Sequence, residues 1–439
     1  MSTQATAVWE MRPATGNNLN GGGFDAGIAG AGTDYSQQDS PQLALTDIAC
    51  VQNSTTVTSV VGGFTAAMVG NALHNTSGTN ILVDWVWITG YTDTHTITVD
   101  KTIASAGAGS AGVGKIGGAL AFPTTAFGAK TVSGNTVWYK IGTGTLTDAP
   151  TFTGSSGVNL IGYNTTRGDE PVGANRPTLI CGTYVVSMPY HSVVRNIIFT
   201  SGAADTLYVN APGEVINCKF TRTGAGSKVS VCSTGNANGL SVEDCEIIGP
   251  GSAGTGIGTN VCKVKNCIIK GHASGISTAG AESIMIQGTI VAGNTVGLVN
   301  NSSANNLDIS SCTFYNNGTH IQNSGATRLK LRNTIISVGT YGLWKSGAPA
   351  LEGCQSDYCC WNCTTDIYNG NAKGKYDITG DPLMVDPANG DYTLQIGSPC
   401  IGAGAGPGTK IGLAKSFSWN IGADQSDHVP LSGQTWGVY

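Results

Sequence analysis

Charged residues are scarce in this sequence: Lys, Arg, Asp and Glu make up 11% of its 439 positions, against about 25% in ordinary soluble proteins. The formal net charge is −5, and the Lys and Arg residues are scattered along the chain. A protein that binds nucleic acid gathers basic side chains on one surface to neutralise phosphates. Nucleic acid is therefore excluded as an expected partner.

Long hydrophobic runs are also absent. The longest uncharged apolar stretch, Thr58 to Leu73, is interrupted by three glycines and is shorter than the roughly 20 apolar residues that span a bilayer. The first residues, MSTQATAVWEMRPATG, contain no apolar segment of the kind found in signal peptides. We therefore expect no membrane insertion and synthesis in the cytoplasm. In that reducing compartment the 13 cysteines are expected as thiols.

The sequence does contain a repeat of about 22 residues, a period typical of solenoid proteins. Eight segments of similar pattern follow one another at offsets between 20 and 27 residues. They are Val194–Phe199, Val215–Phe220, Val242–Ile247, Val264–Ile269, Ile286–Val291, Ile309–Phe314, Leu331–Ile336 and Leu351–Ser356. The spacing of a leucine-rich repeat is missing, and no helical pattern fills the gaps. A β-solenoid is therefore favoured.

The third position of each segment holds the residue types that best tolerate a left-handed backbone. The predicted bend residues are Asn196, Asn217, Asp244, Asn266 and Asn333, with Gly288 and Gly353 in two further segments and Ser311 as the exception. One such residue between two short strands turns the chain sharply without a loop. A bend of this kind in every repeat predicts a right-handed parallel β-helix.

The residue after the bend, Ile197 in the first segment and Cys or Thr in the others, faces the interior because strand side chains alternate between the two faces. In five segments it is cysteine: Cys218, Cys245, Cys267, Cys312 and Cys354. These five cysteines are predicted to form a buried column of small apolar side chains. A second strand, upstream of the bend strands, repeats Ile276, Leu298, Ile321 and Leu343, and supplies another wall.

The repeat divides the chain into three predicted parts. Residues 1–117 show ordinary strand patterns with Gly and Asn turns and are expected to form a small β-rich N-terminal domain for attachment or capping. Residues 118–400 form the parallel β-helix, and residues 401–439 close its other end. The predicted fold class is all-β.

Four isoleucines occupy the outward position after the bend, where solvent-exposed residues are expected. They are Ile198, Ile268, Ile290 and Ile335. A long apolar stripe on one wall is an interface signature, and it predicts side-by-side association of the rods as a homotrimer. The alternative is that a loop of the same chain covers the stripe.

No catalytic constellation stands out, and none is predicted. Glu243, Asp244 and Glu246 form the densest acid cluster. Asp244 is a bend residue, and neighbouring lysines favour charge pairing at the surface over catalysis. The six histidines share no short spacing with Ser or Cys, although a triad assembled in space stays open.

Two segments resemble metal sites, but the prediction is that no metal or other cofactor is bound. Cys354, Cys359, Cys360 and Cys363 form C-x4-C-C-x2-C, whereas structural zinc sites usually have two cleanly spaced pairs. Asp381, Asp386, Asn389 and Asp391 suit a calcium loop, but they are also ordinary turn residues.

The repeats, together with the closing segment DPLMVDPANGDYTLQIGSPCIGAG at residues 381–404, resemble the right-handed parallel β-helix (pectin-lyase-like) superfamily. The opening, VWEMRPATGNNLNGGGFDAGIAGAGTDYSQQDSPQLALTD, looks like uncharacterised proteins encoded in the structural gene modules of tailed phages. That superfamily includes lyases, hydrolases and purely structural proteins, so the resemblance implies the fold more strongly than an activity.

These observations lead to three hypotheses. The first is a non-enzymatic bacteriophage structural protein on the virion surface, as a capsid decoration, head spike or tail component that contacts other virion proteins. The second is a tailspike-type enzyme that binds and cleaves a host surface glycan. The third is a glycan-binding adhesin without catalysis.

Overall fold

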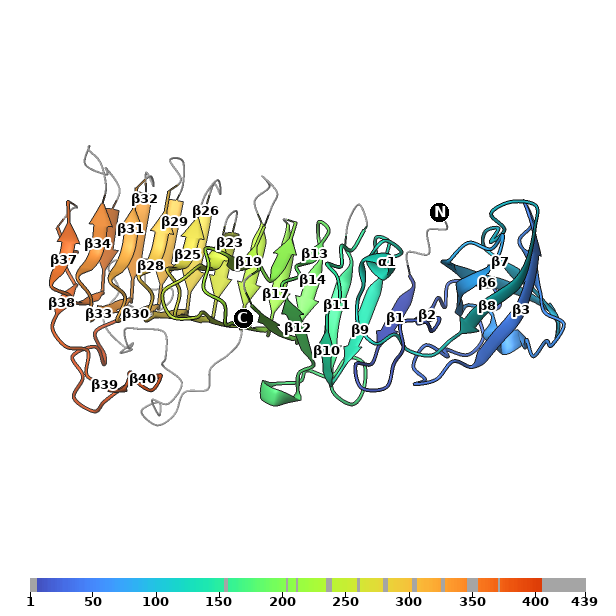
Figure 1. The fold of residues 1–439 in the computed structure, drawn as a ribbon. Coiled ribbons are helices and arrows are strands. Elements are labelled where there is room, and N and C mark those ends of the chain that lie inside the picture. Colours follow the sequence, from blue (N-terminus) through green and yellow to red (C-terminus); the bar gives the residue numbers. More distant parts are fainter. Residues whose placement is uncertain are drawn as a thin grey trace. The chain divides into compact units, whose positions relative to one another are not determined.

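The computed structural model describes residues 6–404, apart from 154–156, 203, 211, 234–238, 259–260, 279–282, 302–305, 325–327, 346–353 and 370–371. Residues Met1–Phe220 form one compact unit and Thr221–Tyr439 a second. Almost every regular element in the described residues is a β-strand (Figure 1), which confirms the all-β fold class. Within this part of the chain, no helix is both long enough and apolar enough to cross a membrane.

Six strands of the first unit close an antiparallel barrel in the order β3-β4-β7-β6-β5-β8. They are β3 (Leu43–Val51), β4 (Thr56–Thr58), β5 (Ala72–Thr79), β6 (Asp84–Asp93), β7 (Thr96–Val99) and β8 (Ala108–Ile116), with the short helix η1 (Ala66–Met68) between β4 and β5. Alternating side chains such as Ile48, Leu73 and Ile97 are fully buried and fill the barrel. This barrel is the small β-rich N-terminal domain that the sequence predicts.

The chain before the barrel belongs to a different sheet. Strand β1 (Val8–Met11) pairs in parallel with β9 (Thr136–Lys140), and antiparallel with the two-residue strand β2 (Gly23–Phe24). Buried Trp9 of β1 packs edge-on against Phe127 of the short helix α1 (Thr125–Gly128), with ring centroids 5.1 Å apart. Residues Val8–Met11 therefore belong to the parallel sheet and not to the barrel.

Parallel coils make up the rest of the first unit. One sheet continues from β9 through β11 (Asn159–Tyr163) and β14 (Val193–Arg195) to β17 (Gly213–Ile216). The other strands are β10 (Thr143–Thr145), β12 (Thr178–Gly182) and β15 (Ile198–Ser201) in a second sheet, and β13 (Val186–Met188) and β16 (Leu207–Val209) in a third. Strand β18 (Lys219–Arg222) and the one-turn helix η2 (Gly173–Asn175) complete the list of elements up to Arg222.

The second unit repeats one three-strand coil (Figure 1). The strands before the bend are β20 (Leu240–Glu243), β23 (Val261–Lys265), β26 (Ser283–Gln287), β29 (Asn306–Ser310), β32 (Arg328–Arg332) and β35 (Cys354–Asp357). The strands after the bend are β21 (Glu246–Ile248), β24 (Ile268–Lys270), β27 (Ile290–Ala292), β30 (Thr313–Tyr315), β33 (Ile335–Ser337), β36 (Cys360–Asn362) and β38 (Ile378–Thr379). The third sheet consists of β19 (Val229–Cys232), β22 (Thr255–Gly258), β25 (Ser274–Thr278), β28 (Val296–Asn300), β31 (Thr319–Asn323), β34 (Tyr341–Lys345) and β37 (Thr365–Tyr368).

Equivalent residues of successive coils pair directly, so the core consists of columns. In the third sheet, the fully or almost fully buried Ile276, Leu298, Ile321 and Leu343 lie in register, as their spacing in the sequence predicts. After the bend, the fully buried residues Ile269, Val291, Phe314, Ile336 and Trp361 form a second column. Because each buried side chain removes apolar area from water, every added coil extends one continuous core.

The chain then leaves the coils and forms a two-stranded antiparallel sheet of β39 (Met384–Asp386) and β40 (Asp391–Leu394). Their buried side chains, with those of Ile290, Ile335 and Cys360, make one apolar cluster. The C-terminal segment therefore packs on the outer face of the sheet that contains β27, β33 and β36. Most of the predicted closing part, from residue 405 onward, lies outside the described residues.

Candidate functional site

The bend residues adopt the backbone conformation for which their type was singled out. Asn196, Asn217, Asp244, Asn266 and Asn333 have φ between 48° and 61°. Ser311 and Gly288 share this conformation. The side chains also connect neighbouring coils: Asn217 Nδ2 donates to Asn196 Oδ1 at 2.7 Å, and Asn266 Nδ2 donates to Asp244 Oδ1 at 3.1 Å. These contacts hold the bends in a row, which is a structural role.

Four of the predicted interior cysteines, Cys218, Cys245, Cys267 and Cys312, are buried. Each thiol donates a hydrogen bond to the carbonyl two residues upstream, just before the bend, with S···O distances of 3.1–3.3 Å. Thr289 and Thr334 use their hydroxyls in the same way at equivalent positions. In these six coils the position therefore holds a small hydrogen-bond donor, whereas the first repeat has the buried Ile197 there. The alternation of Cys and Thr in the repeat is the signal that reveals this.

The eighth repeat is out of register with the prediction. Leu331 pairs with Ser356, and Arg332 pairs with Asp357. The bend residue of this coil is therefore Tyr358, with a φ of 56°, and not Gly353, which lies outside the described residues. Cys359 follows this bend, is buried, and donates its thiol to the carbonyl of Asp357. Cys354 instead pairs with Leu329 in the strand before the bend, and its side chain lies outside the described part.

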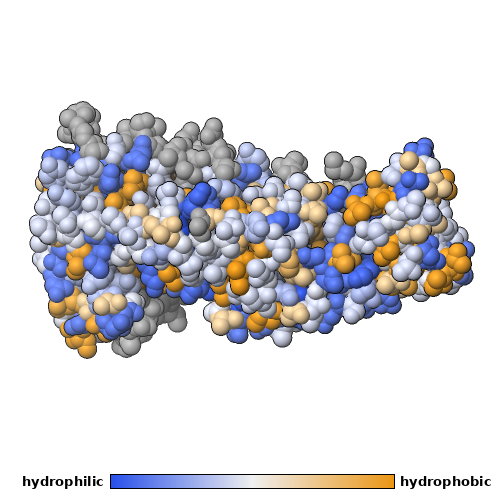
Figure 2. All heavy atoms as spheres, in the orientation of Figure 1, coloured by the Kyte–Doolittle hydropathy of each residue, from blue (hydrophilic) through white to orange (hydrophobic). Residues whose placement is uncertain are grey.

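The outward isoleucines do not form one exposed stripe. Ile290 and Ile335 are buried, at 7% and 1% exposure, under Met384, Tyr392 and Leu394 of the C-terminal segment. Ile268 remains 37% exposed, and Ile198 of the first unit is half-buried. The prediction of an interface was wrong for Ile290 and Ile335, because the chain's own C-terminal segment covers them. On the face drawn in Figure 2, hydrophobic residues of the second unit form small separate patches.

A groove lies beside this covered surface in the second unit. It has a volume of about 320 Å³ and is lined by residues of successive coils and of the C-terminal segment, among them Lys270, Tyr315, Asn316 and Tyr392. The rings of Tyr315 and Tyr392 meet edge to face with centroids 5.8 Å apart. The lining of the groove therefore combines one lysine with two tyrosines.

The acid cluster forms charge pairs. Glu243 accepts hydrogen bonds from Lys263 Nζ at 2.7 Å and from Ser241 Oγ at 2.8 Å. Burial opposes ionisation of Glu243, but these two hydrogen bonds outweigh it and hold the pKa of the carboxyl below its ordinary value. Lys270 Nζ lies 4.0 Å from Glu246. A carboxyl held ionised in this way suits a structural ion pair and does not suit a general acid.

The suspected metal ligands are engaged in other contacts. Among the described residues, no three His, Cys, Asp or Glu side chains gather so that they could hold a metal ion. Asp381 Oδ1 accepts from the Leu383 N–H, and Asp391 Oδ1 accepts from the Thr393 N–H. Asp386 Oδ2 accepts from Asn389 Nδ2 at 2.8 Å. The first two are the local hydrogen bonds of Asx turns, and the third is a local side-chain contact.

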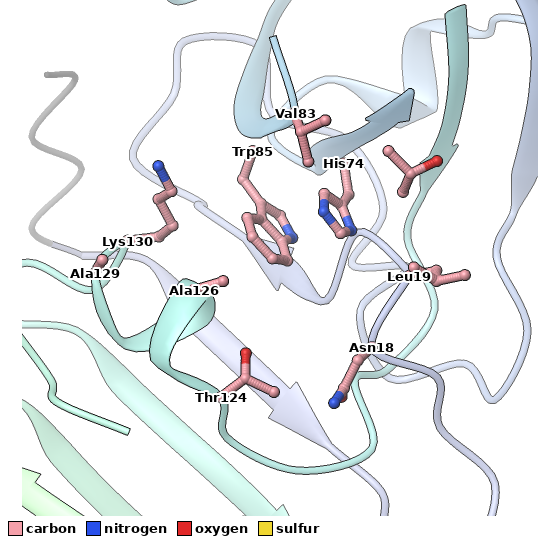
Figure 3. A pocket seen from close by; sticks show the side chains of 10 residues that line it. Asn18, Leu19, His74, Val83, Trp85, Thr124, Ala126, Ala129 and Lys130 are labelled. Atoms are coloured by element: carbon pink, nitrogen blue, oxygen red, sulfur yellow. The ribbon is translucent and has the colours of Figure 1, made fainter. Parts of the chain in front are cut away.

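One cavity in the first unit was not foreseen from the sequence. It measures about 350 Å³ and lies between strands β5 and β6 and helix α1, as Figure 3 shows. His74 and Trp85 stack in its wall with ring centroids 3.6 Å apart. Lys130 at its edge pairs with Asp84 at 2.7 Å. Burial lowers the pKa of His74 to about 4, so its imidazole is neutral at neutral pH.

The opening segment is fastened to the first coils by a buried carboxylate. Glu10 of β1 is fully buried and pairs with Arg12 at 3.1 Å and with Arg167 at 2.8 Å. The hydroxyl of Tyr163 on β11 donates to the same carboxylate, and Arg167 also pairs with Asp34 at 3.0 Å. A buried charge needs partners of this kind, because an unpaired one would be costly. The segment before the barrel is thus bound to the coil that follows the barrel.

Residues 182–356 match the family described as the right handed beta helix region. The chain contains a right-handed parallel β-helix. The match covers coils from both units, and it confirms the fold that the 22-residue repeat predicts.

No curated protein matches the chain. Among solved structures, it is similar to the tailspike protein gp49 from Pseudomonas phage LKA1, with 13% identity and a TM-score of 0.22. The alignment covers 78% of this chain and 64% of that one, so the chain spans less than two thirds of the length of this solved protein.

Proposed function

We propose that this β-helix protein is a non-enzymatic structural component of a tailed bacteriophage particle, made in the host cytoplasm and displayed on the virion surface. The observation that carries the proposal is the ion cluster around Glu10. It binds the opening segment, which resembles phage structural proteins, to the first parallel coils. The opening segment and the first coils therefore belong to one folded unit, which suits a protein that is attached through its N-terminal part.

The β-helix supports this role physically. Columns of equivalent apolar contacts, such as Ile276 to Leu343 and Ile269 to Trp361, support each coil through its neighbours. A solenoid of this kind can be extended by adding coils, because each coil and its interface with the next add to the free energy of unfolding. The proposed partners are other virion proteins, in the capsid or the tail, that bind the N-terminal barrel.

Self-association as a homotrimer stays a prediction. Of the isoleucines that motivated it in the second unit, Ile268 alone is exposed among Ile268, Ile290 and Ile335. Burying one Ile stabilises by about 1.5–3 kcal/mol, which is small against the entropy lost on assembly. Other contacts must therefore contribute if copies of the chain associate.

The proposal is tested on purified particles of the phage that encodes the chain. After density-gradient purification, mass spectrometry is expected to find the protein in stoichiometric amount, and exposure of intact particles to protease is expected to release fragments of its β-helix. Absence from purified particles would overturn the proposal. As a control, an internal capsid protein measured in the same digestion is expected to stay intact.

A specific observation favours a second candidate, a tailspike-type protein that binds and degrades a host surface glycan. Two tyrosine pairs lie on the last coils: Tyr341 with Tyr368 at 5.3 Å, and Tyr358 with Tyr376 at 4.8 Å between ring centroids. Tyr368 and Tyr376 are 41% and 48% exposed. Exposed aromatic rings present an apolar face with a polar tip, which suits sugar rings.

Incubation of the purified protein with host capsule or lipopolysaccharide separates the candidates. Release of new reducing ends would establish the tailspike-type enzyme, and binding without cleavage, lost in Tyr368→Ala and Tyr376→Ala, would establish an adhesin. Neither is expected for the structural protein. Tyr35→Ala, in the opening segment, serves as the control for an unrelated tyrosine.

A further inference from the structure

Two cysteines that are far apart in the sequence meet under the C-terminal segment. Cys360 lies on β36, and Cys400 follows β40. Both are fully buried and belong to the apolar cluster that also contains Ile335 and Leu394. Each thiol is close enough to the other to shift its pKa. The two side chains are therefore neighbours in this cluster, although one belongs to a coil and the other to the segment that covers it.

The surroundings of the pair differ from those of the cysteines in the column after the bends. The Cys312 thiol donates to the backbone carbonyls of Ile286 and Ser310 and is held within its own coils. The Cys360 thiol, one position further along its strand than Cys359, points out of the coil toward the C-terminal segment. It also lies 3.4 Å from the carbonyl oxygen of Gly380. The Cys400 backbone N–H donates to Ser398 Oγ, which positions this cysteine in its turn.

The two thiols are not equivalent in acidity. The hydrogen bond from Cys360 lowers the pKa of Cys400, with a further contribution from Ser398. The same contact, together with burial, raises the pKa of Cys360. Cys400 is therefore the first of the two to become a thiolate, and the thiolate is the form that attacks a disulfide.

We propose that Cys360 and Cys400 form a disulfide bond that fastens the C-terminal segment to the β-helix when the protein passes from the reducing cytoplasm into an oxidising medium. The oxidant is a small disulfide such as oxidised glutathione. The Cys400 thiolate attacks it, forms a mixed disulfide and releases one glutathione thiolate. Cys360 loses its proton and attacks Cys400 Sγ, which forms the S–S bond and releases the second glutathione. Two cysteine thiols are oxidised, and one glutathione disulfide is reduced to two thiols.

Burial makes this reaction depend on local opening. Neither sulfur is accessible while the segment is closed, and the segment has two short strands of its own, β39 and β40. Such a segment opens more readily than the coils below it. Once the bond forms, opening no longer separates the segment from β36. The C-terminal segment would then open and close reversibly in the reduced protein inside the cell. After oxidation outside the cell, the disulfide would hold it closed.

The test uses the full chain, purified under reducing conditions and then incubated with oxidised glutathione at pH 8. The expected product is lighter by two hydrogen atoms, and non-reducing proteolytic mapping joins the peptide of Cys360 to the peptide of Cys400. Limited proteolysis between residues 381 and 404 is expected to slow by about tenfold or more after oxidation, because cleavage requires the segment to open. Reduction with dithiothreitol is expected to restore the original rate.

Matched variants complete the design. Cys400→Ser and Cys360→Ser are expected to abolish both the cross-link and the change in proteolysis, whereas Cys363→Ser, three positions from Cys360, is expected to retain both. Circular dichroism is used to check that each variant is folded. The peptide map of the oxidised wild-type protein tests the inference even if a variant fails to fold. The inference is overturned if oxidised wild-type protein joins Cys360 to a different cysteine, stops at a mixed disulfide, or stays fully reduced. None of these outcomes depends on where the protein resides, so they do not bear on the proposed function.

Discussion

The antiparallel barrel and the parallel coils of the second unit bury similar side chains but specify their structure differently. In the barrel, contacts join residues at irregular separations in the sequence: a Cβ on Gly112 of β8 would lie 2.8 Å from Ile48 Cβ and 2.4 Å from Ile81 Cδ1. In the coils, equivalent positions recur every 22 or 23 residues, and each residue pairs with its counterpart in the next coil. Repetition makes the register of the coils visible in the sequence, whereas nothing comparable marks the barrel.

The comparison predicts the largest effects for matched core truncations. Ile309→Ala in β29 and Ile48→Ala in β3 remove the same side chain from fully buried positions. Each is expected to lower the free energy of unfolding by about 2–5 kcal/mol. Hydrogen exchange is expected to distinguish them, because coils contact mainly their neighbours. Ile309→Ala should speed exchange in β26, β29 and β32, and Ile48→Ala should speed it in all six barrel strands. If faster exchange extended over equally many strands in both variants, the proposed difference between the coils and the barrel would be wrong.

Acidification tests the buried histidines of the coils. Burial lowers the pKa of His272 to about 4 and that of His320 to about 3, below the ordinary value of about 6.5. The unfolded chain therefore binds protons at a higher pH than the folded chain. Stability is fully present above pH 6.5 and is lost progressively as the pH falls toward 3, by up to a few kcal/mol per histidine.

Denaturant unfolding between pH 8 and pH 3.5 measures this loss. The slope of stability against pH is expected to decrease in His272→Gln and His320→Gln relative to the wild type, which separates the histidines from the carboxylates that also titrate in acid. His95→Gln, at an exposed position of the barrel, is the control and should leave the slope unchanged. If the coil variants retain the wild-type slope, the histidines do not titrate as described.

The bends are expected to give a smaller effect. Asn266→Val places a β-branched residue at a φ of 51° and removes the hydrogen bond to Asp244. The expected loss is about 1–3 kcal/mol in the free energy of unfolding. Asn266→Gly removes the same hydrogen bond without backbone strain and should be the milder change. If the Val and Gly variants were equally stable, the left-handed backbone would not be the constraint.

Thiol labelling changes no residue, and it is expected to show a clear difference in reactivity between buried and half-buried cysteines. Cys267 and Cys312 are buried, and burial raises the pKa of Cys312 to about 12. A maleimide is expected to label the half-buried Cys262 at least about tenfold faster than these two in native protein, because their reaction requires local opening. Equal rates, measured by peptide mapping, would place Cys267 and Cys312 outside the interior.

Much of the fold could be predicted because the repeat is local and periodic. The bend residues Asn196 to Asn333, the cysteines that follow four of the bends, and the column from Ile276 to Leu343 all come from positions that recur with little change. The eighth repeat misled the prediction for a physical reason. The separation in sequence between Leu331 and its partner Ser356 is longer than the usual repeat. In addition, Tyr358 adopts a left-handed backbone, which its residue type does not predict.

The functional surfaces could not be predicted in the same way. Whether Ile290 is exposed depends on a segment about a hundred residues later, and no period connects Ile290 with Met384 or Leu394. The cavity beside His74 and Trp85 is built from non-repeating parts of the chain. The contact between Cys360 and Cys400 likewise arises from the packing of the C-terminal segment and not from a motif.

Electron cryomicroscopy of intact particles tests the central claim most directly. The account predicts density on the exterior of the virion into which the parallel coils of the second unit fit, at the same site on every particle and with the N-terminal barrel bound to a neighbouring virion protein. Particles from a phage that lacks the gene should lose this density and no other. Exterior density that is unchanged by deletion of the gene would contradict the claim that this β-helix protein is displayed on the virion.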